Sequence, residues 1–427
     1  MATILEGSVR STGERLRVSA RLVDAASGFQ IWSQDYDRQS ADIFKLQDDL
    51  AGQIVQALRG YMNVDLTVPT GRQPPTKDVQ AYELSLQARL IGRGTTASVR
   101  EALALVDQAL VRDPDFADAR VFRAILLAGS AGLGAGPSTL VDDAQREIDR
   151  ALALSPNSAE AHTAQEAIDV MHGHWIEAEA SFRAAMVMGA DDPEVRDFHP
   201  FLILRPAGRI RQSQAEFTAA YHLARTYGWT PHELAITESL LGHDAEAEKF
   251  VELEEQNYGV EQPVRWDIAL IRARAAARSG RYAAAAGLAS QALTDSLRNA
   301  GGGQVMQAVY AALADPAKRP AARQALQDFI PRLTDSIDFR VWTVFVGAFT
   351  MIGDLDGAYA LAGRIADQPF GAHGITLSGD LWRPEMRPFR KDARFAALMA
   401  RTGLSDYWKR YGSPDECDLK DGVLACH

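Results

Sequence analysis

Two histidines separated by one residue are the first groups in this chain that could do chemistry. His172-Gly173-His174 offers two imidazoles, and imidazole nitrogens are common metal ligands. The triplet lies where a turn between two helices is expected, and Trp175 follows it directly. An exposed turn is therefore the simpler interpretation, and no metal site is predicted.

Two clusters of charged residues are predicted to be surface. Carboxylates on one helix could serve acid–base catalysis, but such a run is more typical of a solvated face. The basic cluster lies beside a glycine turn and is interpreted as a surface patch. The acidic residues are Glu252, Glu254 and Glu255, and the basic residues are Arg205, Arg209 and Arg211.

The sequence lacks the short motifs of common catalytic sites. It has no Gly-x-x-x-x-Gly-Lys-Ser/Thr phosphate loop, no Gly-x-Ser-x-Gly nucleophile turn and no His-Glu-x-x-His zinc motif. Its two cysteines, Cys417 and Cys426, cannot build a paired Cys-x-x-Cys metal site. The sequence therefore predicts a protein that is not an enzyme and needs no cofactor.

Charge and hydropathy argue against two further classes of protein, those that bind nucleic acid and those that span a membrane. The 427 residues carry 45 Lys and Arg against 56 Asp and Glu, a net charge of −11 that disfavours nucleic acid as a partner. No apolar run reaches the roughly 18 residues that a membrane-spanning helix needs. The first residues do not resemble a signal peptide, so a soluble, cytoplasmic protein is expected.

The elements that would position these side chains begin with a small α/β domain, predicted over residues 1–68. Apolar and polar residues alternate over 16–22, and a turn signal at 25–28 follows, which predicts a β-hairpin within residues 5–36. Apolar residues then recur at helical spacing over 43–58. Because so small a sheet leaves an edge open, self-association through that edge is predicted.

The rest of the chain is predicted to be a helical repeat array. A linker with three prolines lies between the two parts, and small and bulky residues then recur with a period of about 34, as from Ala144 to Ala178. This period is the signature of tetratricopeptide (TPR) repeats. The predicted fold class is mainly α: a TPR-type solenoid of helical hairpins with a small, truncated N-terminal α/β domain. The predicted boundaries are 69–77 for the Pro-rich linker, 78–370 for the repeats and 371–427 for capping helices and a cysteine-containing tail.

Glycines mark the turn inside the repeats. Each stands five residues before the first small position of the second helix, a register that a generic alanine-rich bundle does not explain. These glycines are Gly173, Gly208, Gly242, Gly280 and Gly353. Residues 129–138 and 301–303 are predicted to be loops.

The first helix of each repeat is expected to line a groove that binds a protein or peptide partner. An aromatic side chain beside arginines suits an interaction hot spot, although packing between repeats is an alternative for Phe198 and Trp229. The residues predicted to face the groove are Glu160, Thr163, Phe198, Arg205, Trp229, His232, Asp267, Arg274 and Arg278.

The tail is predicted to cap the last helical pair. Leu404, Tyr407, Trp408 and Tyr411 follow helical spacing and would cover an apolar end. With no other cysteine in the chain, Cys417 and Cys426 either pair with each other or remain reduced. A disulfide would close a 10-residue loop, for which chain entropy gives roughly 2–3 kcal/mol.

The N-terminal segments resemble the TolB N-terminal-like domain, which in bacteria commonly precedes TPR repeats. The resemblance rests on residues 5–10, 17–18, 24–28, 32–33, 36–38 and 42–48, and tail residues 381–382, 394–395, 403–408 and 414–417 resemble the ends of the same proteins. Family members often carry a class III nucleotide cyclase or winged-helix domain and a transmembrane helix. This chain lacks these, and it lacks the first strands and helix of the TolB-like domain.

Two functional hypotheses follow. The first is a non-catalytic interaction module, a scaffold or adaptor that uses its TPR groove. The second, implied by the resemblance, is the regulatory or sensor half of a bacterial signalling protein whose effector domain is absent from this chain. Under the second hypothesis the chain would be the extracytoplasmic part of a larger membrane-anchored protein.

Overall fold

The computed structural model describes residues 3–12, 15–39, 42–62, 74–92, 96–132, 139–223, 229–258, 266–333, 339–368, 376 and 379–427. Two compact units make up the chain, residues 1–119 and 120–427. This division falls inside the predicted repeat array. The predicted linker lies in the first unit, and its residues 69–73 are outside the described residues.

The first unit begins with a three-stranded antiparallel sheet. Strands β1 (Thr3–Thr12), β2 (Arg15–Asp24) and β3 (Gln30–Gln39) follow one another in sheet order. The sheet has one strand more than the predicted hairpin, because residues before the alternating segment pair with β2 along their whole length. The predicted turn is present, and the Asp24 carboxylate accepts hydrogen bonds from the backbone N–H of Ser27 at 2.8 Å and the Tyr61 hydroxyl at 2.6 Å.

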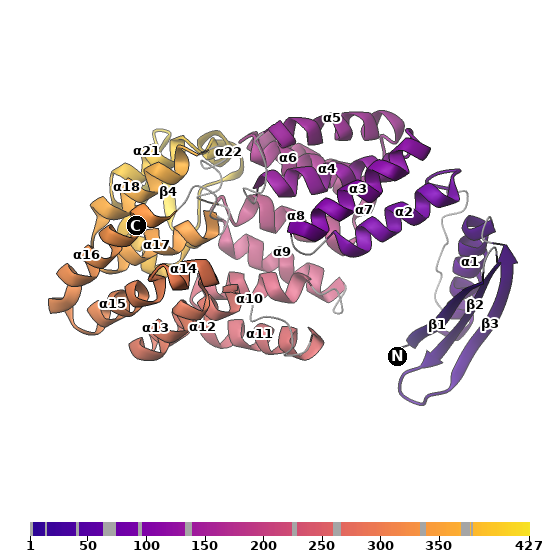
Figure 1. Ribbon diagram of the computed structural model, residues 1–427, viewed down its shortest axis with the longest axis horizontal. Coiled ribbons are helices and arrows are strands. Elements are labelled where there is room, and N and C mark those ends of the chain that lie inside the picture. The colour runs from indigo at the N-terminus through magenta and orange to yellow at the C-terminus, as the bar shows by residue number, and fades with distance from the viewer. Residues whose placement is uncertain are drawn as a thin grey trace. The chain divides into compact units, whose positions relative to one another are not determined.

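Helices complete the first unit. Helix α1 (Ile43–Met62) covers the region predicted to be helical and packs against β3, burying Leu22, Tyr36 and Leu46 (Figure 1). The first helical pair follows as α2 (Val79–Ile91) and α3 (Thr96–Arg112). The Asp78 side chain caps α2 by accepting from Ala81 N–H at 2.9 Å, and it also pairs with Arg112.

Further helical pairs form the second unit, so the chain is mainly α, a solenoid of helical hairpins. Helix α4 spans the boundary between the units. The helices are α4 (Ala117–Gly132), α5 (Thr139–Leu154), α6 (Ala159–Met171), α7 (Trp175–Gly189), α8 (Pro193–His199) with the π-helical turn η2 (Pro200–Leu204), α9 (Ile210–Leu223), α10 (Trp229–Leu241), α11 (Asp244–Tyr258), α12 (Trp266–Arg278), α13 (Tyr282–Gln291), α14 (Asp295–Asn299), α15 (Gly302–Ala314), α16 (Arg319–Phe329), α17 (Phe339–Met351) and α18 (Leu355–Ala366), with 3₁₀ turns η3 (Pro316–Lys318) and η4 (Ile330–Arg332) flanking α16.

The predicted repeat register is confirmed. All five marker glycines lie between the two helices of a pair with φ between 73° and 83°, a left-handed conformation that a Cβ disfavours. The small and bulky positions of the second helices, such as Ala144, Ile148 and Ala151, are fully buried. Both loop predictions differ from the structure. Residues 129–132 belong to α4, and residues 133–138 lie outside the described residues. Helix α15 starts at Gly302, where a Cβ would lie 2.8 Å from Leu293 Cδ1, so this glycine allows close helix packing.

The C-terminal residues return to the middle of the array. Their elements are the 3₁₀ turns η5 (Asp380–Trp382) and η6 (Pro384–Met386), helices α20 (Arg387–Lys391), α21 (Arg394–Ala400) and α22 (Leu404–Tyr411), and strands β4 (Cys417–Lys420) and β5 (Val423–Cys426). The predicted docking of α22 on the last helical pair is wrong. Instead, Trp408 donates to Ala207 O at 2.9 Å, and Trp175 at the start of α7 donates to Thr402 O at 2.6 Å.

Candidate interaction site

A row of first helices, one from each pair, carries most of the predicted groove residues. In the second unit this row includes α6, α8 with η2, α10, α12 and α17. Residues 379–416, here called the clasp, run along this row and contact residues that lie on helices far apart in the sequence. The clasp therefore occupies the position in which a bound peptide was expected.

The clasp begins at Gly379, a position that has no room for a side chain. Gly379 has φ of +72°, and a Cβ there would lie 2.6 Å from Arg205 Cγ and 2.8 Å from Leu240 Cδ1. The backbone thus approaches η2 and α10 closely. The next residue, Asp380, is buried and forms an ion pair with the buried Arg274 of α12.

A second arginine of α12 binds the clasp one helical turn later. Arg278 donates to Glu385 at 2.6 Å and to Ser239 O at 2.9 Å, and it also pairs with Asp244. Burial alone would raise the pKa of Glu385, but the nearby Arg383 and Arg278 outweigh burial and lower that pKa. Glu385 is therefore ionised at neutral pH.

Two tryptophans anchor the clasp at the turn between η2 and α9. The indole N–H of Trp382 donates to Pro206 O at 3.0 Å, and that of Trp408 donates to Ala207 O at 2.9 Å. The rings are perpendicular, with centroids 6.2 Å apart. Gly208 makes room for them, since a Cβ on it would lie 2.6 Å from the Trp382 ring. Each indole is thus both buried and hydrogen-bonded.

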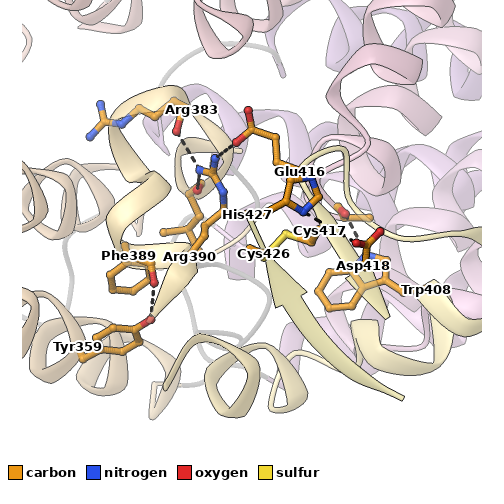
Figure 2. Close-up of a disulfide and its surroundings, with 12 residues drawn as sticks. Tyr359, Arg383, Phe389, Arg390, Trp408, Glu416, Cys417, Asp418, Cys426 and His427 are labelled. Carbon is orange, nitrogen blue, oxygen red and sulfur yellow. Dashed lines mark hydrogen bonds and ion pairs between the residues drawn. A yellow bond between two sulfur atoms is a disulfide. The ribbon is translucent and has the colours of Figure 1, made fainter. Parts of the chain in front are cut away.

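The end of the clasp is held by a buried arginine (Figure 2). Arg390 donates to Leu381 O at 2.7 Å and Arg383 O at 2.8 Å, and it pairs with Glu416. Directly after Glu416, Cys417 lies opposite Cys426 in the β4–β5 hairpin, and the two form a disulfide. Of the two states left open by the sequence, the structure contains the oxidised one.

A buried histidine bridges three helices beneath the clasp. His199 Nδ1 lies 2.7 Å from Glu216 Oε2, and Nε2 lies 3.2 Å from Glu179 Oε2, to which Tyr407 of the clasp also donates at 3.4 Å. Both ring nitrogens face carboxylates, so the ring is an imidazolium. Burial alone would lower the pKa of His199, but these bonds outweigh it and raise the pKa to about 9.

Glu166 of α6 lies next to this bridge. Its side chain is fully buried, and neither carboxylate oxygen has a hydrogen-bond partner. Burial raises the pKa of Glu166 to about 8, with Glu179, Glu216 and Asp169 adding to the shift and His199 opposing it. Glu166 is therefore protonated at neutral pH.

A second histidine bridge repeats the arrangement in the next repeats. His232 of α10 lies 2.8 Å from both Glu254 and Asp267, through Nδ1 and Nε2 respectively. Burial opposes protonation, but the two carboxylates raise the pKa of His232 to about 9. With both nitrogens bound and 2% of its surface exposed, His232 is built to join helices and not to exchange protons with a substrate.

Most of the predicted groove residues lie on the row of first helices, but most are not exposed. Thr163, Arg205, His232 and Arg274 are buried, and the binding of a partner along this row stays a prediction. They are covered because helix neighbours and the clasp pack on them, as Arg205 shows by its ion pair with the buried Glu233 of α10.

The remaining predicted residues lie around this buried layer. Phe198 is partly buried against the hydrophobic core, as the packing alternative held. Asp267 and Arg278 are half-buried and paired, and Glu160 in the first turn of α6 is half-buried. Trp229 starts α10, but its side chain lies outside the described residues.

The interpretation of both charged clusters as solvated surface was wrong for one member each. Arg205, directly after η2, is buried and paired with Glu233 of α10, and Glu254 is the partner of His232. The residues missed by sequence reasoning are those of the clasp, above all Asp380 and Glu385. The repeat pattern did not point to them, since Arg205 and Arg278 also find carboxylates within the repeats, Glu233 and Asp244.

The described residues do not gather metal ligands. Among them, no three His, Cys, Asp or Glu side chains are arranged to hold a metal ion. His172 and His174 lie with ring centroids 5.6 Å apart beside the α6–α7 turn. Within the same described part of the chain, no helix is long and apolar enough to cross a membrane.

Comparison with known proteins gives partial likenesses. No protein-family model matches the chain. It is 34% identical over 127 residues to "Putative adenylate cyclase 3" of Rhizobium meliloti (strain 1021), covering 29% of this chain, and the chain spans about a fifth (21%) of that relative. Among solved structures, PilW, a widely conserved type IV pilus biogenesis factor, matches 49% of this chain and 90% of its own at 21% identity and a TM-score of 0.38. The TPR domain of P58(IPK) matches 77% and 99% at 12% identity and a TM-score of 0.21.

Proposed function

We propose that the helical array is a non-catalytic protein-interaction module whose first-helix row recognises extended acidic and aromatic segments. The observation that supports this best is the seating of the clasp on that row. Asp380 and Glu385 each meet an arginine of α12, and Trp382 fills the site at the η2–α9 turn. Charged pairs and a buried aromatic anchor are the contacts that carry affinity in protein interfaces.

The clasp is, in this proposal, the segment that the row binds within its own chain. A protein partner that uses the row would present the same chemistry, a tryptophan with one carboxylate before it and one after it. The His199 and His232 bridges then fix the spacing of the helices from α7 to α12. They act as rigid supports, since each joins at least three helices.

A trans-binding experiment tests this recognition. In a Trp382→Ala variant of the full chain the clasp loses its anchor, and a fluorescent peptide of residues 379–391 should bind, as measured by anisotropy. The parent protein, with its own clasp in place, should bind the peptide more weakly. Adding Arg274→Ala to the first variant should abolish binding. Equal peptide binding with and without the Arg274→Ala change contradicts the proposal, and so does the absence of binding to a folded Trp382→Ala variant.

A second candidate is the regulatory or sensor part of a signalling protein. The relative from Rhizobium meliloti, named as an adenylate cyclase and much longer than the match, supports this reading. Sequencing the DNA upstream of the Met1 codon tests it. An open frame that encodes a cyclase or winged-helix domain supports the regulatory role, and an in-frame stop codon directly upstream removes it.

A further inference from the structure

Strand β1 leaves one edge of the N-terminal sheet open. It is the first strand in the order β1-β2-β3, so among the described strands none pairs with its outer side. Its ten residues pair with β2 in an unbroken register from Thr3 to Thr12. The strand contains neither proline nor lysine, and it has none of the bulges that natural sheets use to block an edge.

The opposite edge differs from β1. Helix α1 packs against β3, whose Tyr36 is 3% exposed. The β2–β3 register also shifts between Leu22 and Val23, which twists that side of the sheet. An incoming strand is therefore expected at β1.

Apolar side chains of β1 remain uncovered. Leu5 and Val9 align with Leu22 and Val18 of β2, on the sheet face where Leu22 is buried. Yet Leu5 is 52% exposed and Val9 68% exposed. The apolar face thus continues beyond the part of the sheet that is buried.

We propose that β1 pairs antiparallel with β1 of a second copy of this chain, centred on Ser8. In this register Glu6 lies opposite Arg10 of the second copy, and the two-fold symmetry forms the pair twice. On the other face Val9 lies opposite Gly7 of the second copy, which has no side chain and leaves room for it. Charge and size are both complementary, and the product is a continuous six-stranded sheet.

Sedimentation velocity of the full chain over the micromolar range tests the pairing. The parent protein should pass from monomer to dimer as concentration rises. Glu6→Arg or Arg10→Glu alone places like charges opposite each other twice, and each should raise the dimer Kd by about ten-fold or more. The double variant Glu6→Arg/Arg10→Glu restores opposite charges and should return the Kd close to the parent value.

The double variant separates pairing from folding. Glu6 also accepts a hydrogen bond from Arg21 of its own chain at 2.6 Å, and this bond is lost in Glu6→Arg and in the double variant but kept in Arg10→Glu. The double variant can therefore restore only the charge pair between residues 6 and 10 of the two copies. Arg38→Glu, a charge reversal on β3, is the matched control and should leave the dimer unchanged. A parent that stays monomeric, single variants that dimerise like the parent, or a double variant that is not rescued would overturn the proposal.

Discussion

Replacing Glu166 by glutamine should stabilise the protein, and the gain should depend on pH. Glutamine keeps the shape of a protonated glutamic acid but cannot ionise. Glu166 is fully buried without a hydrogen-bond partner for either oxygen, among Glu179, Glu216, Asp169 and His199. In the folded state its pKa is about 8, against an ordinary value of 4.5 that applies to the unfolded chain. The folded protein therefore holds the proton that the unfolded chain releases between these two values.

The magnitude follows from proton linkage. Each pH unit between the two pKa values costs the folded state about 1.4 kcal/mol. Below pH 4.5 both states are protonated and Glu166 costs nothing through ionisation. From pH 4.5 to 8 the parent loses stability, on the order of 3 kcal/mol by pH 7 and 5 kcal/mol above pH 8. Glu166→Gln removes this loss.

Urea unfolding, followed by circular dichroism at several pH values, measures the difference. Parent and variant should coincide near pH 4.5, diverge as pH rises and reach a constant separation above pH 8. The protons of His199 and His232 are also lost toward pH 9. Because Glu166 interacts with His199, the difference between the two proteins reports Glu166 together with this interaction. Glu252→Gln, on an exposed residue of α11, should show no such divergence. A separation that does not change with pH would refute the reasoning.

Two further predictions concern the clasp, and a third concerns the disulfide that follows it. Trp408→Ala empties a site that is 1% exposed and should destabilise the protein by about 3–5 kcal/mol in thermal melts, whereas Val187→Ala at an 84% exposed position should be neutral. Arg274→Ala leaves the Asp380 carboxylate buried without its cation and should cost about 3–5 kcal/mol in urea, part of which an added Asp380→Asn change should recover. Thiol titration of unfolded, unreduced protein, from its native host and alkylated at lysis, should find no free thiol at Cys417; two thiols per chain would contradict the disulfide.

The repeat register was predictable because its signals are local. Gly173 and Ala178 lie five residues apart, and their roles in the turn and the close helix contact are set within one hairpin. The same period recurs through the chain, so each repeat supports the interpretation of the next. Strand β1 was less clear, because the face that it shares with Leu22 carries Gly7 between Leu5 and Val9, and a glycine weakens a strand pattern.

The contacts of the first-helix row could not be predicted in the same way. His232 and Arg274 carry no local sign of burial, since their partners lie on other helices or in the clasp. Arginine and histidine at such positions are ordinarily exposed. Only an ion pair with a carboxylate from another part of the chain offsets the free-energy cost of burying their charge. Where Asp380 meets α12 depends on the path of the whole chain, for which periodicity gives no information.

The clasp also determines how the second unit can fold. In a linear repeat protein every contact joins neighbours, so folding can start anywhere and the ends can unravel independently. The bond from Trp408 to Ala207 instead joins residues 201 positions apart. Closing a loop of that length costs roughly 5 kcal/mol of chain entropy before any contact forms. During synthesis the helical pairs can assemble as they emerge, but the closing step must wait until residues 379–416 have been made. We therefore expect the contacts of the clasp to form slowly and late in refolding. In unfolding experiments, α7 to α18 should unfold as a single cooperative block.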